Sequence, residues 1–443
     1  MGVTRNHIVA IIGGGVAGSE AAAQLVRRGV KVLIFEQNAL PYGKLEEGLP
    51  KWHIKLRDQE EQKIDEKLDH PDIHYIPCTR FGKDITLNAL QQWGISAILL
   101  AFGAWRDRRL PIQDIDNYIG KGLYYQNQLV SWFNHQHEDR WSGMSCQIED
   151  DAIIIGGGLA SLDVVKIVTI ELLLSSLQKL GIQQDLFTLE KEGIPAVLKK
   201  HKLSLKKLGI KGCTLYYRRR IEDMPISPLP TKISKTQKEK IYSLRKRIVS
   251  NLQRHYCFRV VENHFPIDKL VQDDRLIGLV FQVQGSSGKL RKVYSPLTIS
   301  SIGSVPEKYS EIPFENDLLA LEEPLLGKVK GLANVFAIGN AVTGRGNIRE
   351  SLTHSRITTQ HLLENFLQWQ RNHFRELVRA QELQTITTIK EIDHHLKTRT
   401  GLSSSKINII LQKVRQLQLR VGYTGGYREW IARHLPARLE NLE

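Results

Sequence analysis

The sequence of 443 residues predicts an α/β protein with two parallel-sheet halves and a helical C-terminal tail. A short apolar run, a glycine cluster and a helical pattern follow one another at residues 7–28, and a similar series recurs at residues 152–180. Each series is typical of a strand, a tight turn and a helix, which together open a βαβ unit. The chain after residue 375 is mostly helical in pattern with one glycine break at residues 422–426, which predicts the tail.

The first glycine cluster has the spacing of a dinucleotide-binding turn. Gly13, Gly15 and Gly18 lie between a strand and a helix, and Glu36 follows the next strand. The first glycine permits a tight turn, the second lets the backbone approach a pyrophosphate, and the third lets the helix pack on the strand. The acid accepts hydrogen bonds from ribose hydroxyls. The four residues together predict a dinucleotide site.

The second cluster repeats this spacing with two differences. Gly156 and Gly158 are followed by Ser161 in the third place, and the strand that would carry the ribose-binding acid ends in Arg218 and Arg219. Guanidinium groups pair well with a phosphate dianion, such as the 2′-phosphate of NADP. A solvated basic turn is the alternative interpretation of these arginines.

Composition argues against several other classes of protein. With 41% hydrophobic and 25% charged residues the chain is typical of globular proteins. Its longest apolar run, Ala97–Trp105, is about half of the roughly 20 residues that span a bilayer, so we expect no membrane span. The N-terminus lacks the features of a secretory signal, and the four scattered cysteines favour neither disulfides nor an iron–sulfur cluster. We therefore expect a cytoplasmic protein, and no motif indicates a metal site or a hydrolytic triad.

The net charge of +15 comes from one segment of the chain. Residues 199–259 hold 18 Lys and Arg against 3 Asp and Glu, and the remainder holds 44 of each sign. Such a basic segment favours acidic partners. Because it has few aromatic residues and no nucleic-acid-binding motif, nucleic acid is an unlikely partner.

Two dinucleotide sites in one chain predict that a nicotinamide passes a hydride to a bound flavin. Four segments then resemble the adrenodoxin reductase and glutamate synthase small subunit family of flavoproteins, over residues 7–365. They are residues 42–53 (YGKLEEGLPKWH), 102–110 (FGAWRDRRL), 217–225 (YRRRIEDMP) and 335–347 (VFAIGNAVTGRGN).

The resemblance implies two Rossmann-like dinucleotide-binding domains. The FAD-binding domain would be discontinuous, with residues 1–149 and 302–375, and the NAD(P)H-binding domain would be inserted as residues 150–301. Residues 376–443 would form a helical extension. FAD would contact Gly13, Gly15, Gly18, Glu36, Gly43, Leu45, Gly48, Gly103, Gly339, Asn340, Gly346, Asn347 and Ile348. NADPH, with NADH as an alternative donor, would contact Gly156, Gly158, Ser161, Arg218 and Arg219.

Some residues depart from the family pattern. Glu46 and Glu47 stand where the family often has Arg-Tyr, and Asn340 replaces the usual Asp. His53 matches a family histidine near the flavin, where it would tune the ring or relay a proton, although a packed histidine is the alternative. A helix beginning near Asn347 would direct its positive end at the flavin.

The family resemblance implies an FAD-dependent NADPH oxidoreductase of the ferredoxin-NADP reductase type. Reduced flavin would pass single electrons to an acidic carrier such as ferredoxin or flavodoxin, docked on residues 199–259. Two alternatives stay open: an electron-input subunit of a larger complex, which would dock through its tail, and a flavin-dependent monooxygenase.

Overall fold

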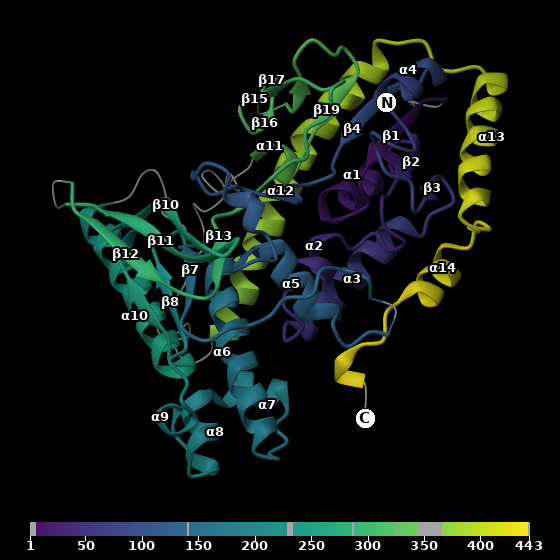
Figure 1. The fold of residues 1–443 in the computed structure, drawn as a ribbon. Helices are drawn as coiled ribbons and strands as arrows, with labels where there is room; N and C mark the ends of the chain where they lie inside the picture. Colours follow the sequence, from purple (N-terminus) through teal and green to yellow (C-terminus); the bar gives the residue numbers. More distant parts are fainter. Residues whose placement is uncertain are drawn as a thin grey trace.

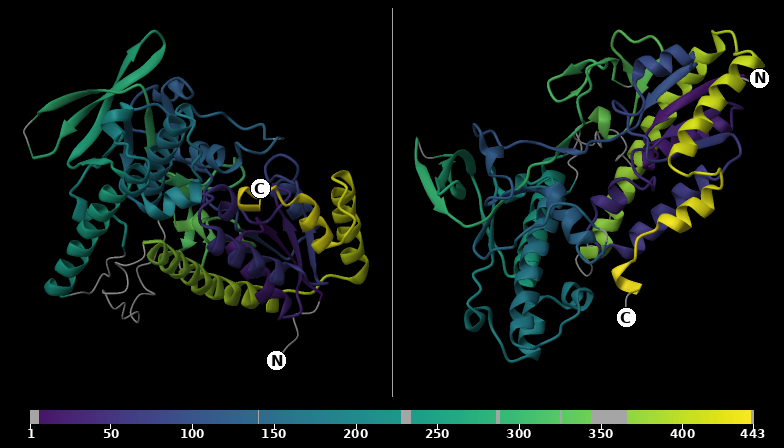
Figure 2. Two further views of the ribbon diagram at one scale, coloured as in Figure 1. Left: turned by 90° about the horizontal axis from the view of Figure 1, so that it is seen from below. Right: turned by 45° about the vertical axis from the view of Figure 1, so that its right-hand side comes forward.

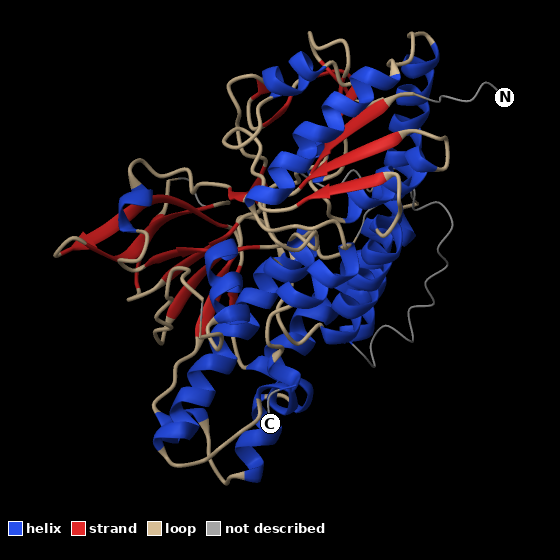
Figure 3. Cartoon of the chain, turned by 90° about the vertical axis from the view of Figure 1, so that its right-hand side faces the viewer, coloured by secondary structure: helices blue, strands red, loops and turns tan. Residues whose placement is uncertain are grey.

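The computed structural model describes residues 6–139, 141–227, 234–285, 288–324, 326–343 and 366–441. Figure 1 shows two sheet-containing lobes, and the long helix α12 (Phe366–Lys397) extends from the first lobe toward the second. The strands of the two sheets form separate groups with helices around them (Figure 3). None of the helices in these ranges is long and apolar enough to cross a membrane.

The first lobe contains a seven-stranded sheet in the order β17-β18-β19-β4-β1-β2-β3. Its five parallel strands are β1 (Ile8–Ile12), β2 (Lys31–Phe35), β3 (Ile73–Ile76), β4 (Ala97–Leu100) and β19 (Val335–Ala337). The antiparallel edge is made by β17 (Leu321–Glu323) and β18 (Lys328–Val329). All five residues of β1 are buried, because helices cover both faces of a parallel sheet.

The second lobe repeats this arrangement. Its parallel sheet has the order β6-β13-β7-β8-β9. The strands are β6 (Leu123–Tyr125), β7 (Ala152–Gly156), β8 (Cys213–Tyr216), β9 (Arg259–Val261) and β13 (Thr298–Ser301). A separate antiparallel sheet of β10 (His264–Gln272), β11 (Arg275–Val283) and β12 (Leu290–Tyr294) projects from this lobe (Figure 2). In both lobes the strand that precedes the glycine turn therefore lies centrally, where open α/β sheets place their ligand sites.

Helices connect and cover the strands. In the first lobe these are α1 (Val16–Val26), α2 (Lys44–Glu47), α3 (Ile54–Leu68), α4 (Leu87–Trp93) and α11 (Asn340–Thr343). Those associated with the second lobe are α5 (Gln126–His135), α6 (Leu159–Lys179), α7 (Leu186–Glu192), α8 (Ile194–Lys200), α9 (Leu205–Leu208) and α10 (Lys235–Tyr256). The tail adds α13 (Ser404–Arg420) and α14 (Tyr427–His434).

The chain crosses between the lobes at two places that lie side by side. The short strands β5 (Arg106–Asp107) and β14 (Ser304–Val305) pair antiparallel with each other. Strand β6 comes after β5 and pairs with β13 in the second sheet. Strand β6 therefore belongs to the second sheet, although the first domain was predicted to continue to residue 149. The sequence did not reveal this strand because three residues have no recognisable pattern, and the glycine turn marks only the next strand of this lobe, β7. The other domain limits stay a prediction.

The tail packs on the first lobe. Residue 376, where the extension was predicted to begin, lies inside α12. The indole Nε1 of Trp430 donates to the Ala39 carbonyl at 2.8 Å, and the Tyr427 hydroxyl donates to Asp65 Oδ1 at 2.7 Å. Helices α13 and α14 accordingly run along the outer side of the first lobe (Figure 1).

Candidate functional site: a cavity at the first glycine turn

A cavity of about 480 Å³ lies at the carboxyl ends of the central strands of the first sheet. This volume falls in the usual range of small-molecule sites, roughly 300–1,000 Å³. Ile12, Phe35 and Ala101 contribute to it from the ends of β1, β2 and β4, and Ala160 contributes from the beginning of α6. The beginning of the helix that follows the second glycine turn therefore reaches the cavity, whereas the residues predicted to contact NADPH, Gly156, Gly158, Ser161, Arg218 and Arg219, are not in its lining.

Eight of the residues predicted to contact FAD line this cavity. They are Gly13, Gly15, Glu36, Gly43, Leu45, Gly48, Gly103 and Asn340. Gly18 and Gly339 are not in its lining. The predicted contacts Gly346, Asn347 and Ile348 lie outside the described residues, as does the predicted beginning of a helix at Asn347.

The first turn is shaped by close backbone approaches. Gly13 has a φ of +102°, and a Cβ there would lie 2.7 Å from the Ala101 carbonyl oxygen. A Cβ on Gly18 would lie 1.9 Å from the Gly13 oxygen. A Cβ on Gly15, in contrast, would meet only the Pro41 oxygen, at 3.8 Å. Gly13 and Gly18 thus serve the fold, and Gly15 leaves free space in the cavity wall beside the N-terminus of α1. A pyrophosphate fits there, next to backbone N–H groups.

Glu36 is the one acid among the described residues that line the cavity. Its side chain accepts hydrogen bonds from the backbone N–H groups of Gly14 at 2.8 Å and Asn38 at 3.0 Å. Burial raises its pKa, and these backbone bonds oppose the shift. Each carboxylate oxygen has a further lone pair, so Glu36 can also accept hydrogen bonds from two ribose hydroxyls.

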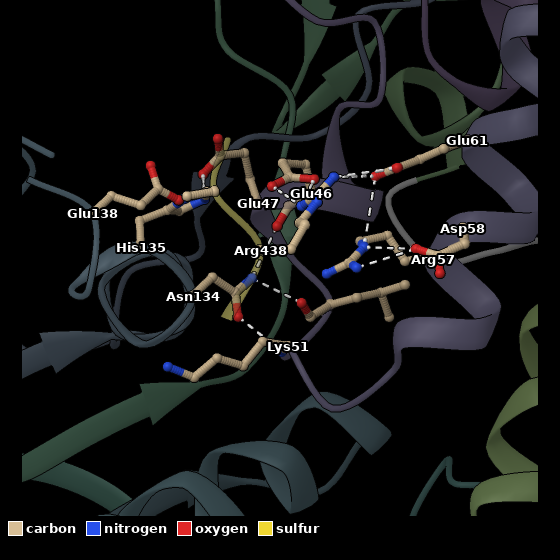
Figure 4. A network of polar contacts seen from close by, with 12 residues as sticks. Glu46, Glu47, Lys51, Arg57, Asp58, Glu61, Asn134, His135, Glu138 and Arg438 are labelled. Atoms are coloured by element: carbon tan, nitrogen blue, oxygen red, sulfur yellow. Dashed lines mark hydrogen bonds and ion pairs between the residues drawn. The ribbon is translucent and has the colours of Figure 1, made fainter. Parts of the chain in front are cut away.

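The loop around α2 forms the next part of the wall. Tyr42, Gly43, Lys44 and Leu45 line the cavity, whereas Glu46 and Glu47 are not in the lining. Glu47 pairs instead with His135 of α5 at 3.4 Å (Figure 4). The two acids that depart from the family pattern thus point away from the cavity.

Glu46 belongs to a buried charge network with the C-terminal segment. Arg438 donates to Glu46 Oε2 at 2.6 Å and to Glu61 Oε1 of α3 at 3.1 Å (Figure 4). Arg57 of α3 pairs with Glu440 in the same network. Burial raises the pKa of Glu61 to about 8, with Arg438 opposing and Glu46 adding to the shift. The network ties the end of the chain to the cavity loop.

His53 lies at the junction of the lobes, outside the cavity lining. Only 6% of it is exposed, and its Nε2 lies 3.8 Å from Asp163 Oδ1 of α6. The neighbouring ring of Trp52 packs in the core of the second lobe, 4.3 Å from the buried ammonium of Lys166. This position fits a packed histidine that joins the two lobes.

The second turn differs from the first in how it closes. A Cβ on Gly156 would lie 2.5 Å from the Ser161 Cβ, and a Cβ on Gly158 would meet nothing within 4 Å. The Ser161 hydroxyl donates to the Gly158 carbonyl at 2.6 Å. The serine therefore replaces the third glycine without blocking the turn, and the N-terminus of α6 remains open to a pyrophosphate.

Arg218 and Arg219 directly follow the four residues of β8 and Tyr217. Strand β8 lies beside β7 as β2 lies beside β1, so Tyr217 takes the register position that Glu36 has in the first lobe, and the arginines follow it by one and two residues. Both are exposed, and neither has an ion-pair partner within the described ranges. The next residue, Arg220, is paired with Glu222 at 2.7 Å. Arg218 and Arg219 are thus available to bind a phosphate.

Several lining residues were not predicted from the sequence. Lys44, Trp105, Gln126 and Tyr309 line the cavity, and Tyr309 packs edge-on against Phe102 at a ring distance of 5.3 Å. These residues come from segments far apart in the chain, so no local pattern connects them. Lys44 alone had a signal, as a cation in a loop otherwise made of glycines, apolar residues and acids.

Comparisons with known proteins agree with this geometry. Residues 7–170 match the family described as pyridine nucleotide-disulphide oxidoreductase. The chain is 30% identical over 166 residues to the probable mitochondrial NADPH:adrenodoxin oxidoreductase of Schizosaccharomyces pombe, covering 37% of this chain and 34% of that protein. It is 32% identical over 170 residues to the glutamate synthase (NADPH) small chain of Bacillus subtilis, covering 35% and 31%. The aligned region spans about a third of each relative.

The likeness in fold extends further. The structure of Mycobacterium tuberculosis FprA in complex with NADPH superposes with a TM-score of 0.65 at 14% identity, covering 94% of this chain and 91% of that one. The predicted α/β fold with two dinucleotide-binding domains and a helical C-terminal region is thereby confirmed. Over about a third of its length the chain is thus similar to an adrenodoxin reductase and to a glutamate synthase small chain, and its residues 7–170 match the pyridine nucleotide-disulphide oxidoreductase family.

Proposed function

We propose that the protein is an FAD-dependent NADPH oxidoreductase of the ferredoxin-NADP reductase type. The observation that carries this proposal is that Gly15 of the first turn and Ala160 beside the second turn line one cavity. Bound FAD supplies a ring that accepts a hydride from a nicotinamide and releases electrons one at a time. A shared cavity brings the two rings together, and the protein's own part is to bind, orient and shield them.

The first lobe holds the FAD in this proposal. Backbone N–H groups at the beginning of α1 bind its pyrophosphate next to Gly15, and Glu36 binds the ribose hydroxyls. Residues 42–45, 48 and 49 and the aromatic side chains of Phe102, Trp105 and Tyr309 line the same cavity, and in this proposal they enclose the flavin ring. These side chains exclude water from the place where hydride transfer occurs.

The second lobe holds the NADPH. The N-terminus of α6 next to Gly158 binds its pyrophosphate, and Arg218 with Arg219 binds the 2′-phosphate. NADH lacks this phosphate and would gain nothing from the two guanidinium groups. The proposal therefore includes a preference for NADPH, with NADH as the weaker donor.

An acidic carrier such as ferredoxin or flavodoxin is the proposed electron acceptor. Helix α10 exposes the cations Lys235, Lys238, Lys240, Lys246, Arg247 and Arg254. The buried Arg245 of α10 donates to the carbonyl of Glu222 at 2.9 Å, which places this basic helix close to Arg218 and Arg219. A cationic face beside the nicotinamide site would steer an acidic protein toward the flavin.

The acceptor is tested with the NADPH-reduced protein. Fast reoxidation by oxidised ferredoxin that slows as salt rises supports the reductase, because salt screens exposed charges. Fast reoxidation by oxygen coupled to hydroxylation of a substrate would indicate the monooxygenase instead. Reoxidation only by a stably bound partner protein would indicate the electron-input subunit.

A further inference from the structure

Lys44 gives the cavity a charge that its sequence motif does not explain. It is the only cation among the described residues that line the cavity, and Glu36 is the only acid. Glu36 follows β2 next to the first glycine turn, and Lys44 begins α2 directly after Gly43. The acid lies where the ribose is proposed to bind, and the cation lies in the loop proposed to enclose the ring.

Three elements hold the Lys44 ammonium at the crossing between the lobes. Its Nζ donates to Ser304 Oγ of β14 at 3.0 Å and to Asn127 Oδ1 of α5 at 3.3 Å, and it lies 6.0 Å from the ring centre of Trp105. Asn127 also donates to the Trp105 carbonyl at 2.9 Å, which fixes its amide. The ammonium is thus positioned by neutral groups.

No carboxylate of the described chain lies within ion-pair distance of Lys44 Nζ. Glu46 and Glu47, close by in sequence, are neutralised by Arg438 and His135. Burial lowers the pKa of Lys44 to about 8, with the charge of Asp107 opposing. The ammonium therefore remains mostly protonated at neutral pH. A desolvated and unpaired charge is unfavourable by itself, so it is best placed where a negative charge arrives.

We propose that Lys44 is a charge-tuning residue, whose ammonium stabilises the negative charge that hydride transfer brings to the bound flavin. This inference rests on the proposed function. NADPH that gives up a hydride leaves as NADP⁺ and delivers two electrons and one proton, which is one net negative charge. In a site shielded from water a fixed cation attracts that charge strongly. Lys44 thereby raises the midpoint potential of the flavin.

The test is the midpoint potential of the FAD-loaded protein, measured by spectroelectrochemistry at pH 7. Lys44→Gln keeps a hydrogen-bonding side chain without the charge, and Lys44→Met removes both. We expect each neutral variant to lower the ratio of reduced to oxidised flavin about tenfold at a fixed potential, or about 30 mV for a two-electron couple. Lys44→Arg, which keeps the charge, should stay within threefold of the natural protein.

Lys51→Met is the matched control. Burial also lowers the pKa of Lys51 to about 8, but this lysine lies 4.4 Å from the ring centre of Phe133 and outside the cavity lining. Its loss should leave the potential unchanged. Unchanged potentials in both neutral variants with FAD bound would overturn the role of Lys44. A change in midpoint potential as large in Lys44→Arg as in Lys44→Gln would overturn it too. That result would indicate that the side chain acts by holding its hydrogen-bonding neighbours in place and not by its charge. Absence of FAD from the natural protein would overturn the proposed function itself.

Discussion

The guanidinium of Arg438 donates hydrogen bonds to both carboxylate oxygens of Glu46, across 392 positions of sequence. Through its other nitrogen the same side chain binds Glu61 of α3. Glu46 belongs to the short helix α2, whose neighbours Lys44 and Leu45 line the cavity. Arg438, in the C-terminal segment, therefore holds in place the loop that would enclose the flavin.

Removal of this guanidinium should destabilise the protein. Arg438→Ala leaves the buried Glu46 without its ion-pair partner and leaves Glu61 with the longer contact to Arg57, at 3.9 Å, and breaking a buried pair in this way costs about 3–5 kcal/mol. Urea denaturation measures the change. Arg433→Ala is the control, because Arg433 is exposed on α14 and has no ion-pair partner among the described residues. Equal stability of the two variants would contradict the structural role of the network.

His135 should make stability depend on pH. Burial lowers its pKa, but Glu47 and Glu138 outweigh this effect and raise it to about 9. Because the folded-state pKa lies above the ordinary value near 6.5, the stabilisation is complete below pH 6.5 and is lost as pH rises to about 9. In the natural protein this group should make the free energy of unfolding on the order of 1–2 kcal/mol larger at pH 6 than at pH 9.5, and His135→Gln should remove that difference. If denaturation showed that the free energy of unfolding changes with pH equally in the natural protein and in His135→Gln, the assignment would be refuted.

The second and third glycines of the first turn should respond differently to substitution. Gly18→Ala drives a Cβ into the Gly13 carbonyl, so this variant should lose several kcal/mol of stability or fail to fold. Gly15→Val should keep the fold, since its φ is −59° and its side chain would extend into free space. We expect its affinity for FAD to fall at least tenfold, as measured by fluorescence titration of the apoprotein. A Gly15→Val protein with normal FAD affinity would mean that the cofactor lies elsewhere.

Arg218 and Arg219 should discriminate between the nicotinamide donors. Replacement of both by Ala should raise the KM for NADPH by at least tenfold and leave that for NADH nearly unchanged, because only NADPH has the 2′-phosphate. Arg220→Ala is the control, since Arg220 is already paired with Glu222 and Asp223. Steady-state kinetics with both donors gives the result. An equal rise for both donors would remove the phosphate-binding role.

The parts of the fold that could be predicted are those with a local signal. The strands β1 and β7, their glycine turns and helix α6 lie close to the expected ranges because apolar runs and glycines determine them within a few residues. Helix α3 escaped prediction in a stretch of mixed pattern. Its buried face includes Arg57, Glu60 and Glu61, which interrupt the apolar residues Leu56, Ile64 and Leu68. Glu60 pairs with Lys63 of the same helix, whereas Arg57 and Glu61 pair with Glu440 and Arg438 at the far end of the chain, which no local pattern can reveal.

The candidate site divides in the same way. The residues that bind the proposed phosphates and ribose belong to compact motifs and were predicted from spacing. Another part of the cavity wall joins Lys44, Trp105 and Tyr309 from separate segments, and the crossing of the chain at β5 and β14 brings these segments together. The direction of Glu46 and Glu47 away from the cavity likewise depends on Arg438 and His135, which are distant in sequence.

The central claim is that both glycine turns serve one cavity, so that NADPH reduces FAD bound to the same chain. Anaerobic titration of the FAD-loaded protein with NADPH, followed by flavin absorbance, tests it most directly. We predict that the flavin band bleaches fully with one equivalent of NADPH per chain, and that Gly158→Val, which fills the second turn, prevents the bleaching while FAD stays bound. Retention of the flavin band in the natural protein at excess NADPH would contradict the claim.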